Sequence, residues 1–127
     1  MIKYFQDKTF YASNEPDGWF NWMDAKKLCE DGGRRLAAPC NSDQNAAILQ
    51  LLNTKSYNQF WIGISDNAEE GTWRDVEGNI LIYENWAAAF PKSDILKNCA
   101  KLRKTSGWKD DECSKPLQYV CEGPSIL

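Results

Sequence analysis

The sequence predicts one α+β domain, and three observations carry that prediction. Two segments with helical spacing of apolar residues lie in the first half of the chain, and short strand-like segments separated by turns fill the second half. The length of 127 residues suits a single domain spanning 1–127, since domains commonly hold about 100 to 150 residues. Helices and strands that occupy separate parts of a chain are typical of α+β folds rather than alternating α/β folds.

The first quarter of the chain predicts a strand followed by a helix. Residues 2–12 alternate aromatic and polar side chains, as a strand or hairpin does, and residues 14–18 have turn chemistry. Residues 22–31 have helical spacing, with Asn21 as N-cap and Gly32-Gly33 as the stop. The apolar face expected to be buried comprises Trp22, Ala25, Leu28 and Cys29.

A second helix is expected over residues 42–54. Asn41 and Gln44 have the spacing of a capping box at its start. Its expected buried stripe comprises Ala47, Ile48, Leu51 and Leu52.

Strands and loops are expected after the second helix. Residues 60–64 form a compact run of β-formers, which predicts a strand buried on both faces. Further strands are expected at 72–75, 80–83, 99–102 and 118–122. The irregular stretch 86–98 is long for a compact domain, and such loops are usually functional.

Composition excludes several classes of function. The chain has no histidine, which removes histidine-based catalysis and histidine-containing zinc sites. The net charge of −3 gives no reason to expect nucleic acid as a partner. No apolar run approaches the roughly 20 residues of a membrane-spanning helix, so membrane insertion is not expected. The charge is unevenly distributed, because the charged residues within 66–84 are mainly acidic and those within 92–109 are mainly basic.

The five cysteines favour a disulfide framework, because no C-x-x-C pair is present and disulfides are typical of oxidising compartments. Secretion is therefore expected. Residues 1–15 lack the apolar core of a signal peptide, so a secretory signal is expected outside this sequence. The odd number leaves one thiol free or bonded to another chain.

Motifs along nearly the whole chain resemble those of the C-type lectin-like domain, in particular the short form of collectins and single-domain invertebrate lectins. The matching segments are residues 25–29, 33–37, 60–64 (FWIGI), 70–73 (EGTW), 83–86 (YENW), Cys99, 108–110 (WKD), Cys113 and 120–122. The resemblance implies disulfides between Cys29 and Cys121 and between Cys99 and Cys113. Cys40 then has no partner, and is either a free thiol or an interchain bridge.

The resemblance also indicates where a primary calcium and sugar site would lie. In sugar-binding members the long loop carries Glu-Pro-Asn or Gln-Pro-Asp, and the next strand carries Trp-Asn-Asp. Here the loop triplet is Phe90-Pro91-Lys92, the strand reads Trp108-Lys109-Asp110, and Lys97 replaces a further acidic residue. Calcium requires six to eight oxygen ligands, so no calcium cofactor is expected at this position.

An auxiliary calcium position is half retained. Asp66 and Glu70 match two of its ligands, whereas Ser93, Lys97 and Asn98 stand where carboxylates are expected, with Asp94 as an alternative for one of them. We expect Asp66 and Glu70 to pair with nearby lysines, with weak calcium binding as the alternative.

These replacements predict a calcium-independent recognition module whose basic loop binds an anionic glycan or a protein. The residues expected to contact the ligand are Phe90, Lys92, Lys97, Lys101, Lys109 and Asp110. Three alternatives remain: a protein-interaction subunit, dimeric through Cys40 or non-covalently, with no sugar ligand; an ice-binding protein; and residual calcium-dependent carbohydrate binding. Catalysis is not expected, because adjacent acids such as Asp110 and Asp111 seldom point the same way and the family is overwhelmingly non-catalytic.

Overall fold

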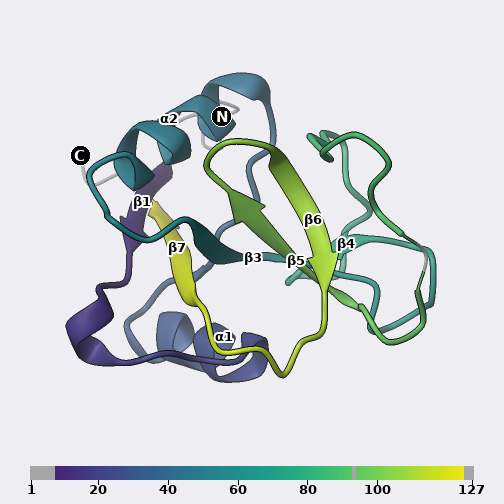
Figure 1. Cartoon of the computed structure of the whole chain (residues 1–127), viewed down its shortest axis with the longest axis horizontal. Helices are drawn as coiled ribbons and strands as arrows, with labels where there is room; N and C mark the ends of the chain where they lie inside the picture. Colours follow the sequence, from purple (N-terminus) through teal and green to yellow (C-terminus); the bar gives the residue numbers. More distant parts are fainter. Residues whose placement is uncertain (1–7, 93, 125–127) are drawn as a thin grey trace.

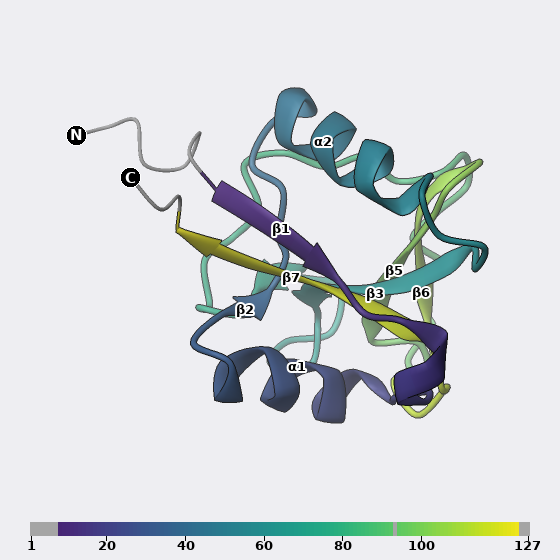
Figure 2. The ribbon, with the colours of Figure 1, turned by 90° about the vertical axis from the view of Figure 1, so that its left-hand side faces the viewer.

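The computed structural model describes residues 8–92 and 94–124. Two helices lie on opposite sides of a central sheet, with α1 (Trp22–Asp31) below and α2 (Ser42–Leu52) above the strands in Figure 2. The other elements are β1 (Lys8–Ala12), a short 3-10 helix (Glu15–Asp17), β2 (Arg35–Leu36), β3 (Gln59–Ser65), β4 (Arg74–Asp75), β5 (Cys99–Arg103), β6 (Gly107–Asp111) and β7 (Gln118–Pro124). The α+β prediction is confirmed. The predicted strand at 2–12 is present from Lys8, and residues 2–7 lie outside the described part.

The strands run in the order β1-β7-β3-β5-β6, with β4 added to β3 (Figure 1) and β2 added to β7 (Figure 2). The sheet is mixed rather than purely antiparallel, because β3 and β7 pair in parallel, with Phe60 opposite Gln118. The expected strand at 80–83 is reduced to one bridge between Ile80 and Arg74. Beyond β4, a long region without regular strands leads to β5, as the sequence predicts for 86–98.

Strand β3 is buried on both faces, as predicted, because its side chains enter two different hydrophobic clusters. Phe60, Ile62 and Ile64 pack in the cluster that includes α2, and Trp61 packs in the cluster that includes α1. Gly63 lies where β3 passes β2. A Cβ at Gly63 would come 2.3 Å from the backbone oxygen of Leu36, so only glycine fits there.

Both helices begin at the predicted caps. The Asn21 Oδ1 accepts from the Asp24 N–H, and the Asn41 Oδ1 accepts from the Gln44 N–H, each at 2.8 Å. The predicted buried faces of both helices need correction. Leu28 is 41% exposed, because it points away from the sheet that covers Trp22, Ala25 and Cys29.

Helix α2 also differs from the prediction, ending at Leu52 rather than at residue 54. Ala47 is exposed and Leu51 is only half-buried, whereas Asn45 is buried. Asn45 is buried because its Oδ1 accepts from the Trp108 indole N–H at 3.1 Å.

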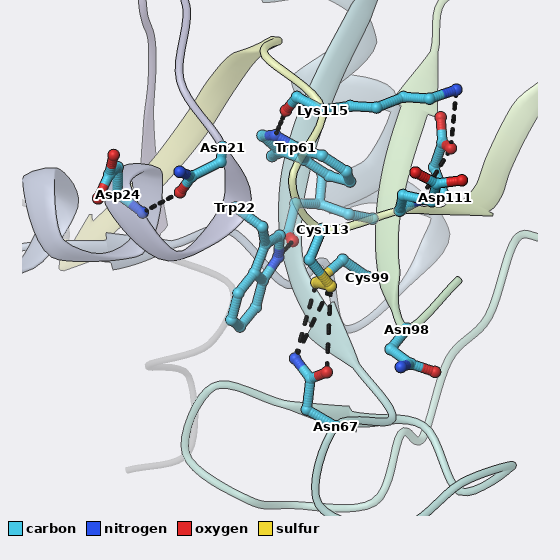
Figure 3. Close-up of a disulfide and its surroundings, with 12 residues drawn as sticks. Asn21, Trp22, Asp24, Trp61, Asn67, Asn98, Cys99, Asp111, Cys113 and Lys115 are labelled. Carbon is cyan, nitrogen blue, oxygen red and sulfur yellow. Dashed lines mark hydrogen bonds and ion pairs between the residues drawn. A yellow bond between two sulfur atoms is a disulfide. The ribbon is translucent and has the colours of Figure 1, made fainter. Parts of the chain in front are cut away.

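Both implied disulfides are present. Cys29–Cys121 joins α1 to β7, and Cys99–Cys113 joins the start of β5 to the segment after β6 (Figure 3). These bonds cross-link residues 92 and 14 positions apart, which restricts the unfolded chain. Cys40 is half-buried and forms no disulfide within the described chain.

Candidate ligand-binding site

The long loop is fixed at its start by a cluster of tryptophans. Trp86 and Trp108 lie edge to face with ring centroids 5.6 Å apart, and Trp73 packs against Trp86 at 4.9 Å. The Ala87 N–H donates to the Trp108 carbonyl oxygen at 2.8 Å, so the loop is bonded to β6 through its backbone. Trp108 is fully buried and Trp86 is half-buried, as expected for aromatic residues with a packing role.

The middle of the loop is fixed by Asp110. Both carboxylate oxygens of Asp110 accept from the backbone N–H of Lys92, each at 3.0 Å. Asp110 is only 3% exposed, so this carboxylate fastens the loop to β6 from inside the molecule. The sequence prediction placed Asp110 in contact with ligand. The structure brings it to the site as an internal anchor for the loop.

Two lysines share the ring of Phe90. The Lys92 Nζ lies 4.6 Å from the ring centroid, and the Lys109 Nζ lies 5.0 Å from it, both within cation–π range. Within the described residues, neither ammonium group has a carboxylate at salt-bridge distance. Loop and strand therefore bring together three of the predicted site residues.

Lys97 lies farther along the loop, half-buried, with its backbone N–H bonded to the Asp94 carbonyl oxygen at 2.9 Å. Its side chain likewise has no ion pair within the described residues. Lys97 is therefore a further uncompensated charge of the loop, although no contact joins it to Phe90.

The prediction for Lys101 is wrong. Lys101 is 8% exposed, and its ammonium group donates to Gln59 Oε1 and Asp111 Oδ2 inside the fold. Asp111 also pairs with Lys115 at 3.0 Å (Figure 3). Burial by itself would raise the pKa of Asp111, but the hydrogen bonds from Lys101 and Lys115 outweigh it, and the pKa is lowered.

Sequence reasoning missed this buried network, although the β5–β6 register contains its signal. Lys101 stands opposite Lys109, and Asp111 is two residues beyond Lys109 on the same face of β6. Such diagonal neighbours are within reach of long side chains.

At the auxiliary calcium position, two buried side-chain oxygens have no hydrogen-bond donor among the described residues. The Asp66 Oδ2 accepts from the Gly71 N–H at 2.9 Å, while the Asp66 Oδ1 and the Asn98 Oδ1 are buried and have no hydrogen-bond partner in the described part. Asn98 lies just before the Cys99–Cys113 disulfide (Figure 3), and its carbonyl oxygen accepts from the Asp66 N–H at 3.1 Å.

Glu70 completes this polar group from the exposed side. Partial desolvation raises the pKa of Glu70, and the charge and hydrogen bond of Asp66 raise it further, followed by the charges of Asp94 and Asp110. The expected ion pairs of Asp66 and Glu70 with lysine are not formed in the described residues.

The sequence matches a known domain family over most of its length. The family described as "Lectin C-type domain" matches residues 20–123. The chain belongs to the C-type lectin domain family. Domains of this family are typically recognition modules without catalytic activity.

Curated C-type lectins resemble the chain at about one third identity. The C-type lectin domain family 3 member A homolog of Xenopus laevis is 37% identical over 120 residues, which cover 91% of this chain and 60% of that protein. Human tetranectin is 30% identical over 129 residues, covering 96% of this chain and 58% of tetranectin. The family 4 member M protein of Nomascus concolor is 30% identical and is covered over only 30% of its length. The chain thus spans a part of each of these relatives.

Solved C-type lectin structures have the same fold. The carbohydrate-recognition domain of the mouse scavenger receptor C-type lectin superposes with a TM-score of 0.85 at 28% identity, covering 95% of this chain and 91% of that domain. A calcium-independent type II antifreeze protein superposes with a TM-score of 0.83 at 20% identity, covering 94% and 88%, and shares the fold alone. No helix in the described ranges is long and apolar enough to cross a membrane.

The C-type lectin fold raises the question of calcium, and the residues present do not fit it at the primary position. That position offers Phe90, two ammonium groups and the carboxylate of Asp110, which is already bonded to the loop backbone. Among the described residues, the auxiliary position offers the carboxylates of Asp66 and Glu70 and the amide oxygen of Asn98, and Ser93 lies outside the described part. Nowhere in the described part do three acidic or cysteine side chains lie close enough together to hold a metal ion.

Proposed function

We propose that this chain acts as one domain over residues 1–127, a secreted recognition module that binds an anionic group without calcium at the primary position. The residues in contact with the ligand are Phe90, Lys92, Lys97 and Lys109. One observation carries the proposal: the ammonium groups of Lys92 and Lys109 lie beside a single aromatic ring, and no described carboxylate pairs with either.

A sulfate, phosphate or carboxylate group suits this arrangement chemically. Charge-assisted hydrogen bonds between ammonium groups and anionic oxygens are about twice as strong as neutral ones. The ring of Phe90 supplies an apolar face next to the two cations, against which the carbon atoms of a sugar or a side chain can pack. An anionic glycan or an acidic segment of a protein provides both features.

The ligand class is tested on a heparin column, with charge reversal of the site. The Lys92→Glu, Lys97→Glu, Lys109→Glu variant is expected to lose retention, because attraction to the sulfate groups becomes repulsion. A matched variant carries the same reversal at Lys26, Lys27 and Lys55, which lie outside the loop. The matched variant is expected to keep most of its retention, and equal loss in both variants would refute a localised site.

A glycan array with and without calcium then separates the anionic ligand from ordinary sugar binding. Binding of sulfated or phosphorylated glycans that persists in EDTA supports the proposal. Binding of neutral sugars that requires calcium would instead support the residual calcium-dependent alternative.

We infer extracellular localisation and the absence of catalysis from related observations. Two disulfides in a small domain are typical of an oxidising compartment. The family is typically non-catalytic, and the loop-facing carboxylate of Asp110 is committed to the Lys92 backbone.

A protein-interaction subunit without a sugar ligand is the second candidate, favoured by Cys40. Cys40 is a half-buried free cysteine in a domain whose other cysteines are bonded. A bridge between two chains would form by two successive exchanges with a small disulfide, which leaves as two thiols. Migration at twice the monomer mass on a non-reducing gel, absent in Cys40→Ser, tests for that bridge.

A further inference from the structure

A groove of about 380 Å³ lies apart from the long-loop site. Its lining comes from β2, from the segment that leads into α2, and from residues 75–83, and it includes neither Phe90 nor the lysines around it. Hollows of about 300 to 1,000 Å³ are typical of small-molecule sites, which are mostly apolar and hold a few polar groups. The apolar part of this lining includes Ala38, Pro39, Val76 and Leu81.

Two isoleucines of the lining are left exposed to water. Ile80 is 63% exposed and Ile82 is 83% exposed, the highest value among the exposed large hydrophobic residues described. Both side chains line the groove, so an apolar body that lies in it removes part of their surface from water. Such burial is favourable in proportion to the area covered, and the groove therefore favours an occupant with an apolar part.

The charged side chains of the groove do not cancel. Its lining has three carboxylates, those of Asp75, Glu77 and Glu122, and two cations, Lys8 and Arg35. Both cations are already engaged, because Glu122 accepts from the Lys8 ammonium at 3.0 Å and from the Arg35 Nε at 2.8 Å, and Arg35 also pairs with Glu77 at 2.8 Å. Asp75 has no ion pair among the described residues, which leaves the groove with one negative charge in excess.

The Asp75 carboxylate also has room for another hydrogen-bond donor. Its Oδ1 accepts from the backbone N–H groups of Glu77 at 2.9 Å and Asn79 at 3.0 Å. Its Oδ2 accepts only from the Asn79 side chain, at 3.4 Å. A carboxylate offers about four lone-pair positions, so the Oδ2 can accept from a further donor. An ammonium group supplies both the donor and the missing positive charge.

We propose that the groove binds a small amphipathic amine, with its apolar body against Ile80 and Ile82 and its ammonium group at the Asp75 Oδ2. The volume suits a small molecule, and the excess negative charge favours a cation over a neutral or an anionic amphiphile of the same size. Cys40 also lines the groove, so its thiol reports whether the groove is filled. This site is separate from the anion site and independent of the proposed function.

Three probes with the same six-carbon chain test the charge of the occupant: n-hexylammonium, 1-hexanol and hexanoate. Isothermal titration calorimetry on the full chain at pH 7 is expected to rank their affinities in that order, with hexylammonium about twofold or more tighter than hexanol. The half-buried Cys40 thiol locates the binding, because an occupied groove slows alkylation of Cys40 by iodoacetamide. Binding of hexylammonium that leaves this alkylation rate unchanged would lie elsewhere and would overturn the inference.

Two pairs of variants separate the charge from the apolar contact. Asp75→Asn keeps an Oδ1 acceptor for the turn and removes the charge, and it is expected to bind hexylammonium about two- to fivefold more weakly and hexanol as wild type does. Asp31→Asn removes a carboxylate from α1, outside the groove, and is expected to bind both probes as wild type does. Ile82→Ser is expected to weaken all three probes, whereas Ile95→Ser, on the long loop outside the groove, is expected to weaken none.

The opposite results refute the amine site. Hexanoate that binds as tightly as hexylammonium would exclude a cationic occupant, and equal losses in Asp75→Asn and Asp31→Asn would exclude the contact with Asp75. A protein that binds none of the probes up to their solubility limits has no such site. The Lys92→Glu, Lys97→Glu, Lys109→Glu variant is expected to keep its affinity for hexylammonium, so failure of the amine site is distinguishable from failure of the anion site.

Discussion

Both carboxylate oxygens of Asp110 lie 3.0 Å from the backbone nitrogen of Lys92. The bond uses the backbone of Lys92 and leaves its ammonium group beside Phe90. In the sugar-binding pattern that this chain resembles, the corresponding carboxylate belongs to a calcium-binding motif. Here a partly buried hydrogen bond fastens the loop, and no described carboxylate pairs with the ammonium groups of Lys92 and Lys109.

Asp110→Asn is expected to weaken anion binding even though it makes the site more positive. The amide offers only one acceptor oxygen and no charge, so the loop loses its fastening, at a cost of about 1 to 2 kcal/mol in unfolding free energy. Denaturant unfolding measures that cost, and the salt concentration that elutes the protein from heparin measures binding. Glu112→Gln removes the same charge from an exposed neighbour and is expected to leave the loop intact. Equal retention of the two variants, both stronger than wild type, would show that net charge alone governs binding.

Glu122→Ala is expected to cost about 3 to 5 kcal/mol of unfolding free energy, because Glu122 is 2% exposed and is bonded to Lys8, to Arg35 and to the Ala38 N–H. Glu77→Ala removes only the outer partner of Arg35 and is expected to cost less than about 1 kcal/mol, since both side chains are about half exposed. Denaturant unfolding of the two variants measures the difference. Similar losses would mean that Glu122 does not organise this ion network.

The lowered pKa of Asp111 predicts a loss of stability in acid. A carboxyl with a lower pKa in the folded than in the unfolded protein stabilises the fold above its ordinary value of 3.8. That contribution disappears as pH falls through the folded-state pKa, because protonation leaves the buried Lys101 without its partner. Asp111→Asn is therefore expected to be least stable relative to wild type near neutral pH, and the gap is expected to close below about pH 4. Unfolding free energies measured from pH 7 to pH 2 test this, and a gap that stays constant would contradict it.

Local patterns predicted the elements of the fold better than the exposure of single residues. The caps at Asn21 and Asn41 depend on a few adjacent residues, and both are confirmed. The predicted burial of Leu28 and Ala47 was wrong. Helical spacing shows which residues share a face, but it does not show how much of that face the neighbouring elements cover. The parallel pairing of β3 with β7 joins segments about 60 residues apart, which no local pattern encodes.

The prediction of the candidate site succeeded for residues that belong to the family motif. It failed for a residue whose burial depends on the register between two strands. Comparison with the family motif identifies the substitutions around Phe90, and the structure places Lys92 and Lys109 beside its ring. Charge alone placed Lys101 with them. Its burial follows from its position in β5, where the register brings Asp111 within reach.

Removal of calcium is expected to leave the stability of this domain nearly unchanged. Among the described residues, the carboxylate at the primary position is that of Asp110, which is bonded to the Lys92 backbone, and the auxiliary position has the carboxylates of Asp66 and Glu70 and the amide oxygen of Asn98. A site filled to a hundred times its dissociation constant would add about 2.7 kcal/mol. At roughly 3 °C per kcal/mol for a domain of this size, EDTA would then lower the melting temperature by about 8 °C. We expect a change of less than about 2 °C in differential scanning calorimetry with calcium or with EDTA.

A restored site supplies the positive control for that measurement. Phe90→Glu, Lys92→Asn, Lys97→Glu and Lys109→Asn together return oxygen ligands to the primary position. Because the loop is already fastened to β6 through Asp110, this variant is expected to gain a calcium-dependent rise in melting temperature that wild type lacks. A large EDTA effect in wild type would mean that the oxygens of Asp66, Glu70 and Asn98 suffice to hold the ion. Loss of that effect in Asp66→Asn would then assign it to the auxiliary position.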